Sequence, residues 1–265
     1  MTTYHPHQRG HADLAALAEE RPLSKIALAG FVLALLAALM VLLAGPGSRM
    51  GWWHFRTGFA LLKWGAYLGI AAALVSAAAI FLAGRARGRL LAVAGVVLAV
   101  AAFAVPWSFR NAARGKPPIH DITTDTRNPP AFVSVARLRA DAPNPVAYEG
   151  EAVAAQQREA YPDIQPLLVA LPLSRAYGEA LATARLMGWD IVAESPKEGR
   201  IEATDQTRWF GFKDDVVIRV SPASGVSRID VRSKSRVGRG DAGANAQRVR
   251  NYLERLRRRV PEASE

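Results

Sequence analysis

Four basic residues near the end of the chain have the types and spacing to hold an anion. Arg232, Lys234 and Arg236 occupy alternate positions of an expected strand and share one face of it, and Arg239 follows. A glycine-rich turn then leads into a helix expected to start at Asp241, where backbone N–H groups and the helix dipole favour negative charge. We therefore predict that these four side chains bind a phosphate, a carboxylate or an anionic headgroup. The alternative is a solvated basic strand beside a helix that Asp241 caps.

Three aspartates are the other candidates for chemistry. Asp214 and Asp215 are adjacent, and adjacent residues of a strand point to opposite faces, so the two carboxylates cannot readily share a metal or a proton. The chain contains no cysteine, and His120 has no second histidine beside it. The sequence thus predicts no catalytic residue, no cofactor and no metal. A hydrolase or transferase that uses Asp214, Asp215 or Asp241 as acid or base stays open as an alternative.

The elements that must carry these residues fall into two parts. Residues 26–110 contain three apolar stretches, at 26–44, 64–83 and 90–107, each about long enough to cross a bilayer as a helix. They follow an amino-terminal tail, residues 1–25. Ionisable side chains are missing from the centres of the stretches, which argues against an ion or proton path. The sequence predicts a three-helix transmembrane anchor.

The loops of the anchor suggest how it is oriented. Gly45-Pro46-Gly47 is typical of a helix end, and the aromatic and basic residues of 52–62 favour the lipid headgroup layer. The short loop 84–89 carries three arginines, and short basic loops tend to stay in the cytoplasm. We therefore expect a multi-pass protein of the inner (plasma) membrane, with its amino terminus inside and its soluble part in the periplasm or otherwise outside the cytoplasm.

The rest of the chain is expected to be water-soluble. Residues 111–172 are rich in proline and should run extended over a surface or act as a tether, with one short strand around Phe132. Residues 173–260 show a helix from Ser174 to Gly188, strands at 189–194, 200–204, 215–220 and 227–233, and a last helix at about 241–259. This order predicts an α+β domain: a helix, a four-stranded antiparallel meander and a helix.

Several motifs of this domain resemble an uncharacterised bacterial family. They are WFGFKDDVVIRV at 209–220, DVRSKSRVG at 230–238 and GAN at 243–245, with TTD at 123–125 and NPP at 128–130 upstream. Together they are similar to domain of unknown function 1499, in its membrane-anchored branch. Other members look like envelope lipoproteins or exported proteins, so the resemblance implies a domain outside the cytoplasm. Some members carry a cysteine near the start of the domain, and this chain has none.

Charge and architecture together favour a binding protein. Within the part of the chain that follows the apolar stretches, basic and acidic residues nearly balance until Arg228, and the basic excess lies after it, which indicates a local anionic partner. We expect a non-enzymatic envelope module that contacts membrane lipid and binds an anionic envelope ligand or a protein partner, and no nucleic acid. If the topology is reversed, the same basic residues predict a cytoplasm-facing binder of lipid or nucleic acid.

Overall fold

The computed structural model describes residues 24–82 and 86–261 of the chain. They form two compact units, one of residues 24–43 and 59–106 and the other of residues 44–58 and 107–261. The two units are described separately below. Most of the expected amino-terminal tail and Arg85 of the basic loop lie outside the described residues.

The first unit consists of helices that are longer than the sequence suggests. They are α2 (Lys25–Arg49), α3 (Phe55–Leu82) and α4 (Ala86–Ala113), and all three are long and apolar enough to cross a membrane. Pro46 does not end the first helix as predicted but lies inside α2. A proline so close to the end removes only one backbone hydrogen bond, and the helix continues for three more residues. The expected interfacial segment 52–62 is largely the first two turns of α3.

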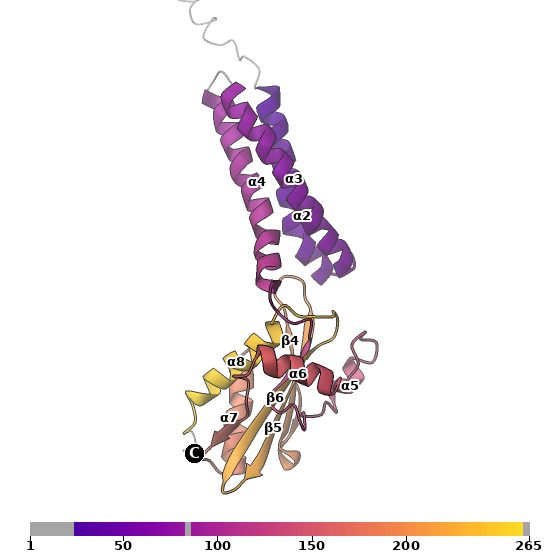
Figure 1. Ribbon diagram of the computed structural model, residues 1–265, viewed down its shortest axis with the longest axis vertical. Coiled ribbons are helices and arrows are strands. Elements are labelled where there is room, and N and C mark those ends of the chain that lie inside the picture. The colour runs from indigo at the N-terminus through magenta and orange to yellow at the C-terminus, as the bar shows by residue number, and fades with distance from the viewer. Residues whose placement is uncertain (1–23, 83–85, 262–265) are drawn as a thin grey trace, which may run out of the picture. The chain divides into compact units, whose positions relative to one another are not determined.

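Small residues fill the space between the three helices, while large apolar side chains point outward. Ala27 packs against Ala79 and Ala92 at one level, and Ala34 packs against Ala72 and Ala99 at another. Residue numbers therefore rise along α2, fall along α3 and rise along α4, so neighbouring helices are antiparallel (Figure 1). This arrangement, with Leu, Val and Phe outside and Ala and Gly inside, is typical of helices that pack in lipid.

The second unit is an α+β domain with more strands than predicted. Its strands are β1 (Asp121–Thr123), β2 (Leu167–Val169), β3 (Asp190–Ser195), β4 (Arg200–Gln206), β5 (Lys213–Ala223) and β6 (Val226–Ser235). Its helices are α5 (Val135–Leu138), α6 (Glu151–Ala160), α7 (Leu173–Leu186) and α8 (Ala244–Arg257), with a 3₁₀ turn η1 (Pro196–Glu198). The predicted α7–meander–α8 order is present, and the sheet has six strands instead of four.

The two additional strands come from the proline-rich segment. The strand order is β1-β6-β5-β4-β3, and β2 also pairs with β6, all antiparallel. Strands β1 and β2 have three residues each, too few for a pattern of alternation to appear in the sequence. Instead of the strand expected around Phe132, the chain forms the short helix α5. Residues 111–172 are therefore an integral part of the sheet domain.

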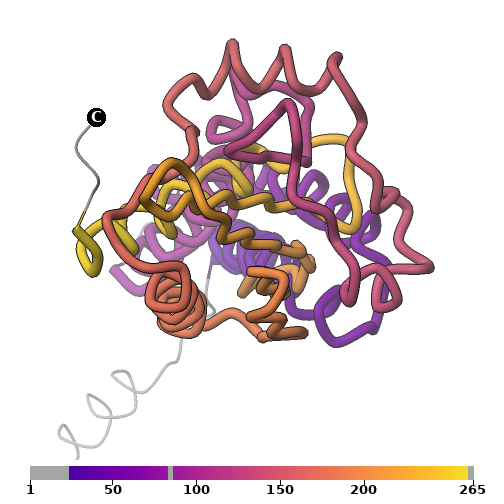
Figure 2. Tube along the Cα trace, turned by 90° about the horizontal axis from the view of Figure 1, so that it is seen from below, coloured from indigo at the N-terminus to yellow at the C-terminus, as the bar shows by residue number. Residues whose placement is uncertain are grey.

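The sheet has an apolar face and a charged face. Helices α7 and α8 cover the first, where Ile201, Ile218 and Val231 pack in the main core and Trp189 stacks on Tyr252 with ring centroids 5.2 Å apart. Segment 124–150 covers the second, where Val217 contacts Phe132 and Val135. In Figure 2 this segment and α7 lie on opposite sides of the strands. Segment 124–150 thus lies over the charged side of the sheet, and residues 111–172 are not extended throughout as expected, because they include the helices α5 and α6.

Candidate functional site

The charged face is built by alternate residues of three neighbouring strands. In one row across the sheet Arg200 of β4 lies opposite Arg219 of β5, and Arg219 lies opposite Asp230 of β6. The next two rows are Glu202, Val217 and Arg232, and then Thr204, Asp215 and Lys234. Because side chains of a strand alternate between faces, the sequence spacing of two places all these groups on one side.

Arg232 of the predicted anion site is buried, with 3% of its surface exposed. Its Nε and Nη2 atoms donate to the two carboxylate oxygens of Asp121 at 2.9 and 2.8 Å. Nη1 and Nη2 also donate to backbone oxygens of the covering segment, and the guanidinium lies over the ring of Phe132, 4.9 Å from its centroid. The two-pronged contact satisfies the positive charge within the chain.

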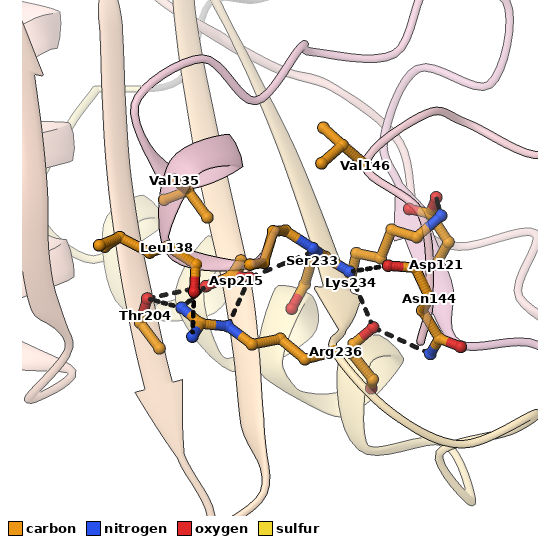
Figure 3. A network of polar contacts seen from close by, with 12 residues as sticks. Asp121, Val135, Leu138, Asn144, Val146, Thr204, Asp215, Ser233, Lys234 and Arg236 are labelled. Atoms are coloured by element: carbon orange, nitrogen blue, oxygen red, sulfur yellow. Dashed lines mark hydrogen bonds and ion pairs between the residues drawn. The ribbon is translucent and has the colours of Figure 1, made fainter. Parts of the chain in front are cut away.

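Lys234 is fully buried next to the same aspartate. Its Nζ atom lies 3.0 Å from Oδ2 of Asp121 and 3.1 Å from Oε1 of Glu149, and it donates to the backbone oxygen of Ala147 at 2.8 Å. Figure 3 shows Lys234 beside Asp121 at one end of the polar network. An ammonium group carries three donors, so these contacts use its full capacity.

Arg236 completes the network at its other end (Figure 3). Its Nε and Nη2 donate to both oxygens of Asp215 at 3.0 and 2.8 Å, and Thr204 donates its hydroxyl to the same carboxylate at 2.8 Å. Arg139 of the covering segment adds a contact of 3.2 Å to Asp215. Burial lowers the pKa of Arg139, and Asp215 opposes that shift. The fully buried Asp215 thus serves two guanidinium groups.

The start of helix α8, near Arg239, is also occupied by a carboxylate of the chain itself. The Asp241 carboxylate accepts the backbone N–H groups of Gly243 and Asn245, both at 2.7 Å. These are the donors that an external anion would need at the start of α8. Of the four predicted site residues only Arg239 is exposed. The tertiary structure therefore brings Arg232, Lys234 and Arg236 together, but with carboxylates of the chain itself.

The two adjacent aspartates point to opposite faces of the sheet. Asp214 lies on the α8 side, where Arg248 donates to it at 2.6 Å, whereas Asp215 belongs to the charged face. Burial raises the pKa of the Asp214 carboxyl, and the charge of Arg248 opposes that shift. Within the described residues no group of three or more His, Asp or Glu side chains is arranged to hold a metal ion.

Glu202 is a residue that the sequence reasoning missed. It is fully buried on β4 and accepts the backbone N–H groups of Val133, Ser134 and Val135 at 2.9 to 3.0 Å. This carboxylate fixes the start of α5 to the sheet. A glutamate between the apolar Ile201 and Ala203 is the signal that could have identified it, because a buried carboxylate must find donors.

Asp125 of the TTD motif shapes the loop that follows it. Its Oδ1 accepts the backbone N–H groups of Arg127 and Asn128 at 3.1 and 2.9 Å, and its Oδ2 accepts from Arg219 and Arg228 at 3.1 and 3.0 Å. The first pair of bonds forms an Asx-type turn, and the second pair attaches that turn to the sheet. The loop with the NPP motif is thereby held over strands β4 and β5.

A cleft opens between this loop and the sheet. It has a volume of about 250 Å³ and is lined by Asn128, Pro129, Pro130, Ala131, Glu198, Arg200, Val217 and Arg219. The prolines, the alanine and Val217 give it an apolar wall, while the two arginines and Glu198 supply charge. Such a combination of apolar lining and a few convergent polar groups is typical of small-molecule sites.

The two arginines of the cleft have donors to spare. Nη2 of Arg200 pairs with Glu198 at 2.7 Å, and its Nε lies 3.1 Å from Glu202 without forming a hydrogen bond. Arg219 uses Nε and Nη2 for Asp230, at 3.3 and 2.9 Å, and Nη2 for Asp125. Among residues 24–82 and 86–261, neither Nη1 atom has a hydrogen-bond partner.

The fold and this cleft define the class of protein. It is an α+β domain whose cleft has an apolar wall and a few charged groups, in a chain with three helices long and apolar enough to cross a membrane. The profile of one family matches residues 121–256, from the first residue of β1 to the last turn of α8. The chain belongs to this family, described as "Protein of unknown function (DUF1499)". A search of the curated proteins finds no match.

Proposed function

We propose that this protein is a membrane-anchored envelope protein whose α+β domain is a non-enzymatic binding module. Its ligand is a small molecule with a carboxylate or phosphate group, and the cleft beneath residues 128–131 is the site that takes it. The carrying observation is the pair Arg200 and Arg219, which lie directly opposite each other in this cleft with one free Nη1 atom each. The anion site thus stays on the face predicted from the sequence but moves to the neighbouring strands.

The chemistry of guanidinium groups supports an acidic ligand. Two like charges directly opposite on neighbouring strands repel each other, and an oxyanion between them relieves that repulsion. The planar donor fork of arginine fits the oxygens of carboxylate and phosphate. The apolar wall of the cleft favours a ligand whose remaining part is uncharged.

The carboxylates near Arg200 and Arg219 differ in how strongly they compete with an incoming anion for these two arginines. Glu202 is already bonded to three backbone N–H groups, and Asp230 and Asp125 both accept from Arg228. Glu198 has no such second partner, and 62% of its side chain is exposed. An incoming anion can therefore displace Glu198 from Arg200 without breaking the buried network.

Anion titration of the whole chain in phosphatidylcholine nanodiscs tests the proposal. The probes are inorganic phosphate and butyrate, followed by isothermal calorimetry. Arg219→Gln removes one of the two donors, and since a hydrogen bond to a charged group is worth about 1.5–3 kcal/mol, binding should weaken about tenfold or more. Unaltered affinity in this variant, or no saturable binding of either probe to the unmodified chain, overturns the proposal.

Arg228→Gln is the matched control. Arg228 contacts the same two carboxylates as Arg219, Asp125 and Asp230, but it does not line the cleft. It should therefore reproduce any loss of stability, and because it leaves both cleft arginines in place it should weaken anion binding less than Arg219→Gln does. Glu198→Gln should strengthen anion binding, because it removes the competing carboxylate. Weaker binding in Glu198→Gln would mean that the ligand needs a negative partner.

The hydrolase or transferase alternative gains no comparable observation. Asp214 and Asp215 are buried in ion pairs, and Asp241 caps α8. None of the three lines the cleft.

A further inference from the structure

A second surface of the α+β unit is built from four segments that contain no acidic residue. It is formed by residues 44–58, 107–118, 206–213 and 236–240, and the sequence of these four segments contains no Asp and no Glu. We call it the carboxylate-free face. It is separate from the cleft, whose lining residues all lie outside these segments.

Contacts within the unit join the four segments into one surface. Phe55 meets the ring of Phe212 edge-on with centroids 5.6 Å apart, and Phe109 stacks on Trp209 at 5.0 Å. The Lys213 backbone oxygen accepts the N–H of residue 236 at 3.0 Å. The glycine at 240 packs closely on Pro118: a Cβ atom added there would lie 3.1 Å from the proline Cα.

Exposed basic side chains cover this face. They are Arg49, Arg56, Arg110, Arg114, Lys116, Arg208, Lys213 and Arg239. None of them forms an ion pair with another residue in the described part of the chain. Some arginines on other parts of the domain do have such partners, as the half-buried Arg250 has in Asp163 and the exposed Arg259 in Glu179.

Large aromatic side chains stand among these charges. Trp52, Trp107 and Phe109 are 61%, 49% and 51% exposed. Indole rings together with arginine and lysine are the combination that favours the headgroup layer of a bilayer, since the rings enter the interface and the cations pair with lipid phosphates. Two of the segments also contain the last residues of α2 and α4.

We propose that the carboxylate-free face binds the headgroup layer of anionic phospholipid, so that the turn 206–213 and the loop 236–240 dock on the membrane. The occupant is the lipid surface, because a partner with many negative charges matches eight cations that have no carboxylate partner among the described residues, and the exposed indole rings beside them suit the bilayer interface. Docking keeps the domain at the membrane and is independent of what the cleft binds.

The absence of cysteine from the chain gives a direct test. A single cysteine at Arg208→Cys carries an environment-sensitive fluorophore, and the full chain is placed in nanodiscs that contain headgroup spin-labelled lipid. Lys197→Cys is the matched control: it also replaces an exposed cation, but it lies beyond the opposite end of β4, roughly 20 Å away at about 3.3 Å per residue.

We expect quenching of the label at position 208 when the nanodisc contains phosphatidylglycerol, and release at high salt, which screens exposed charges. The label at position 197 should stay unquenched. With Lys213→Gln and Arg239→Gln added, the docked-to-free ratio at position 208 should fall about fivefold for each cation removed.

Equal quenching at the two positions, or quenching that ignores lipid charge and salt, overturns the proposal. If the label at position 208 is not quenched on phosphatidylglycerol discs but its fluorescence changes when an oligonucleotide is added, the face binds a polynucleotide and the lipid proposal fails. Adding Arg219→Gln to the Arg208→Cys chain keeps the two proposals separate, because it should weaken anion binding in the cleft and leave the quenching at position 208 unchanged.

Discussion

At the scale of single residues, the charged face of the sheet is an internal ion network. Arg232, Lys234 and Arg236 would read as a free basic surface from the sequence, yet each is held by a carboxylate at 3.1 Å or less. These contacts hold the covering segment, residues 124–150, on the sheet. In many small domains apolar packing alone holds such a segment. Breaking one partner of such a network leaves the other partner buried and uncompensated.

Asp215→Asn is expected to destabilise the domain strongly, by about 3–5 kcal/mol, because it leaves Arg139 and Arg236 without their shared carboxylate. Urea unfolding of the chain in mild detergent measures the change. Asp163→Asn is the control. Arg250 lowers the pKa of Asp163, but the pair is on the surface, and its loss should cost less than about 1 kcal/mol. Similar costs for both variants would contradict the internal role of Asp215.

At the scale of elements, α8 depends on an aspartate that lies outside the helix. Asp241 precedes α8 by three residues and accepts the N–H groups of Gly243, just before the helix, and of Asn245 in its first turn. The glycine-rich turn between them allows this, since Gly243 has a φ of +84°, which a side chain would strain. The helix start that the sequence suggested as an anion site is therefore capped by the carboxylate of Asp241.

Asp241→Ala should lower the free energy of unfolding by about 0.5–2 kcal/mol, the range found when a capping side chain is lost. Asp241→Asn should cost less, because an amide oxygen still accepts the N–H groups. Thermal unfolding followed by circular dichroism compares the two variants. If phosphate stabilises Asp241→Ala but not the unmodified chain, the helix start can hold an anion once its own carboxylate is gone.

The anchor helices depend on two glycines in a comparable way. A Cβ atom on Gly30 or Gly95 would lie 2.5 or 2.4 Å from Oγ of the buried Ser76, so only glycine lets the three helices approach there. Gly95→Leu should lower the stability of the anchor in detergent by about 1–3 kcal/mol, measured as the SDS concentration at which near-ultraviolet circular dichroism is lost. Val97→Leu, at an outward position 62% exposed, should leave that concentration unchanged.

At the scale of the whole molecule, the number of helices determines where the two ends of the chain lie. Three antiparallel helices that all cross one membrane leave the residues before α2 and after α4 on opposite sides. A binding module of the envelope requires the second of these sides to be the outer one. The basic loop between α3 and α4 favours this orientation.

Topology reporters fused after Glu265 test the orientation. We expect activity from an enzyme that works only outside the inner membrane and none from one that works only in the cytoplasm. The same pair fused before Met1 should give the reverse result. Cytoplasmic activity after Glu265 would overturn the envelope proposal and return the basic face to the candidates for cytoplasmic lipid or nucleic acid.

The sequence by itself determined what depends on local pattern. Length and hydropathy predicted the three apolar helices, strict alternation predicted β5 and β6, and apolar spacing predicted α7 and α8. The motif residues were also enough for the family. These features are encoded in consecutive residues, so no knowledge of distant contacts is needed to find them.

Only the tertiary structure decided which charges meet. Asp121 and Arg232 are separated by 111 positions and Asp125 and Arg219 by 94, and no local pattern pairs them. Strands β1 and β2 exist because β6 offers them backbone partners, not because three residues form a strand alone. The same long-range pairing turned the predicted anion site into an ion network, while Arg200 and Arg219 in the cleft each keep one Nη1 atom without a hydrogen-bond partner among the described residues.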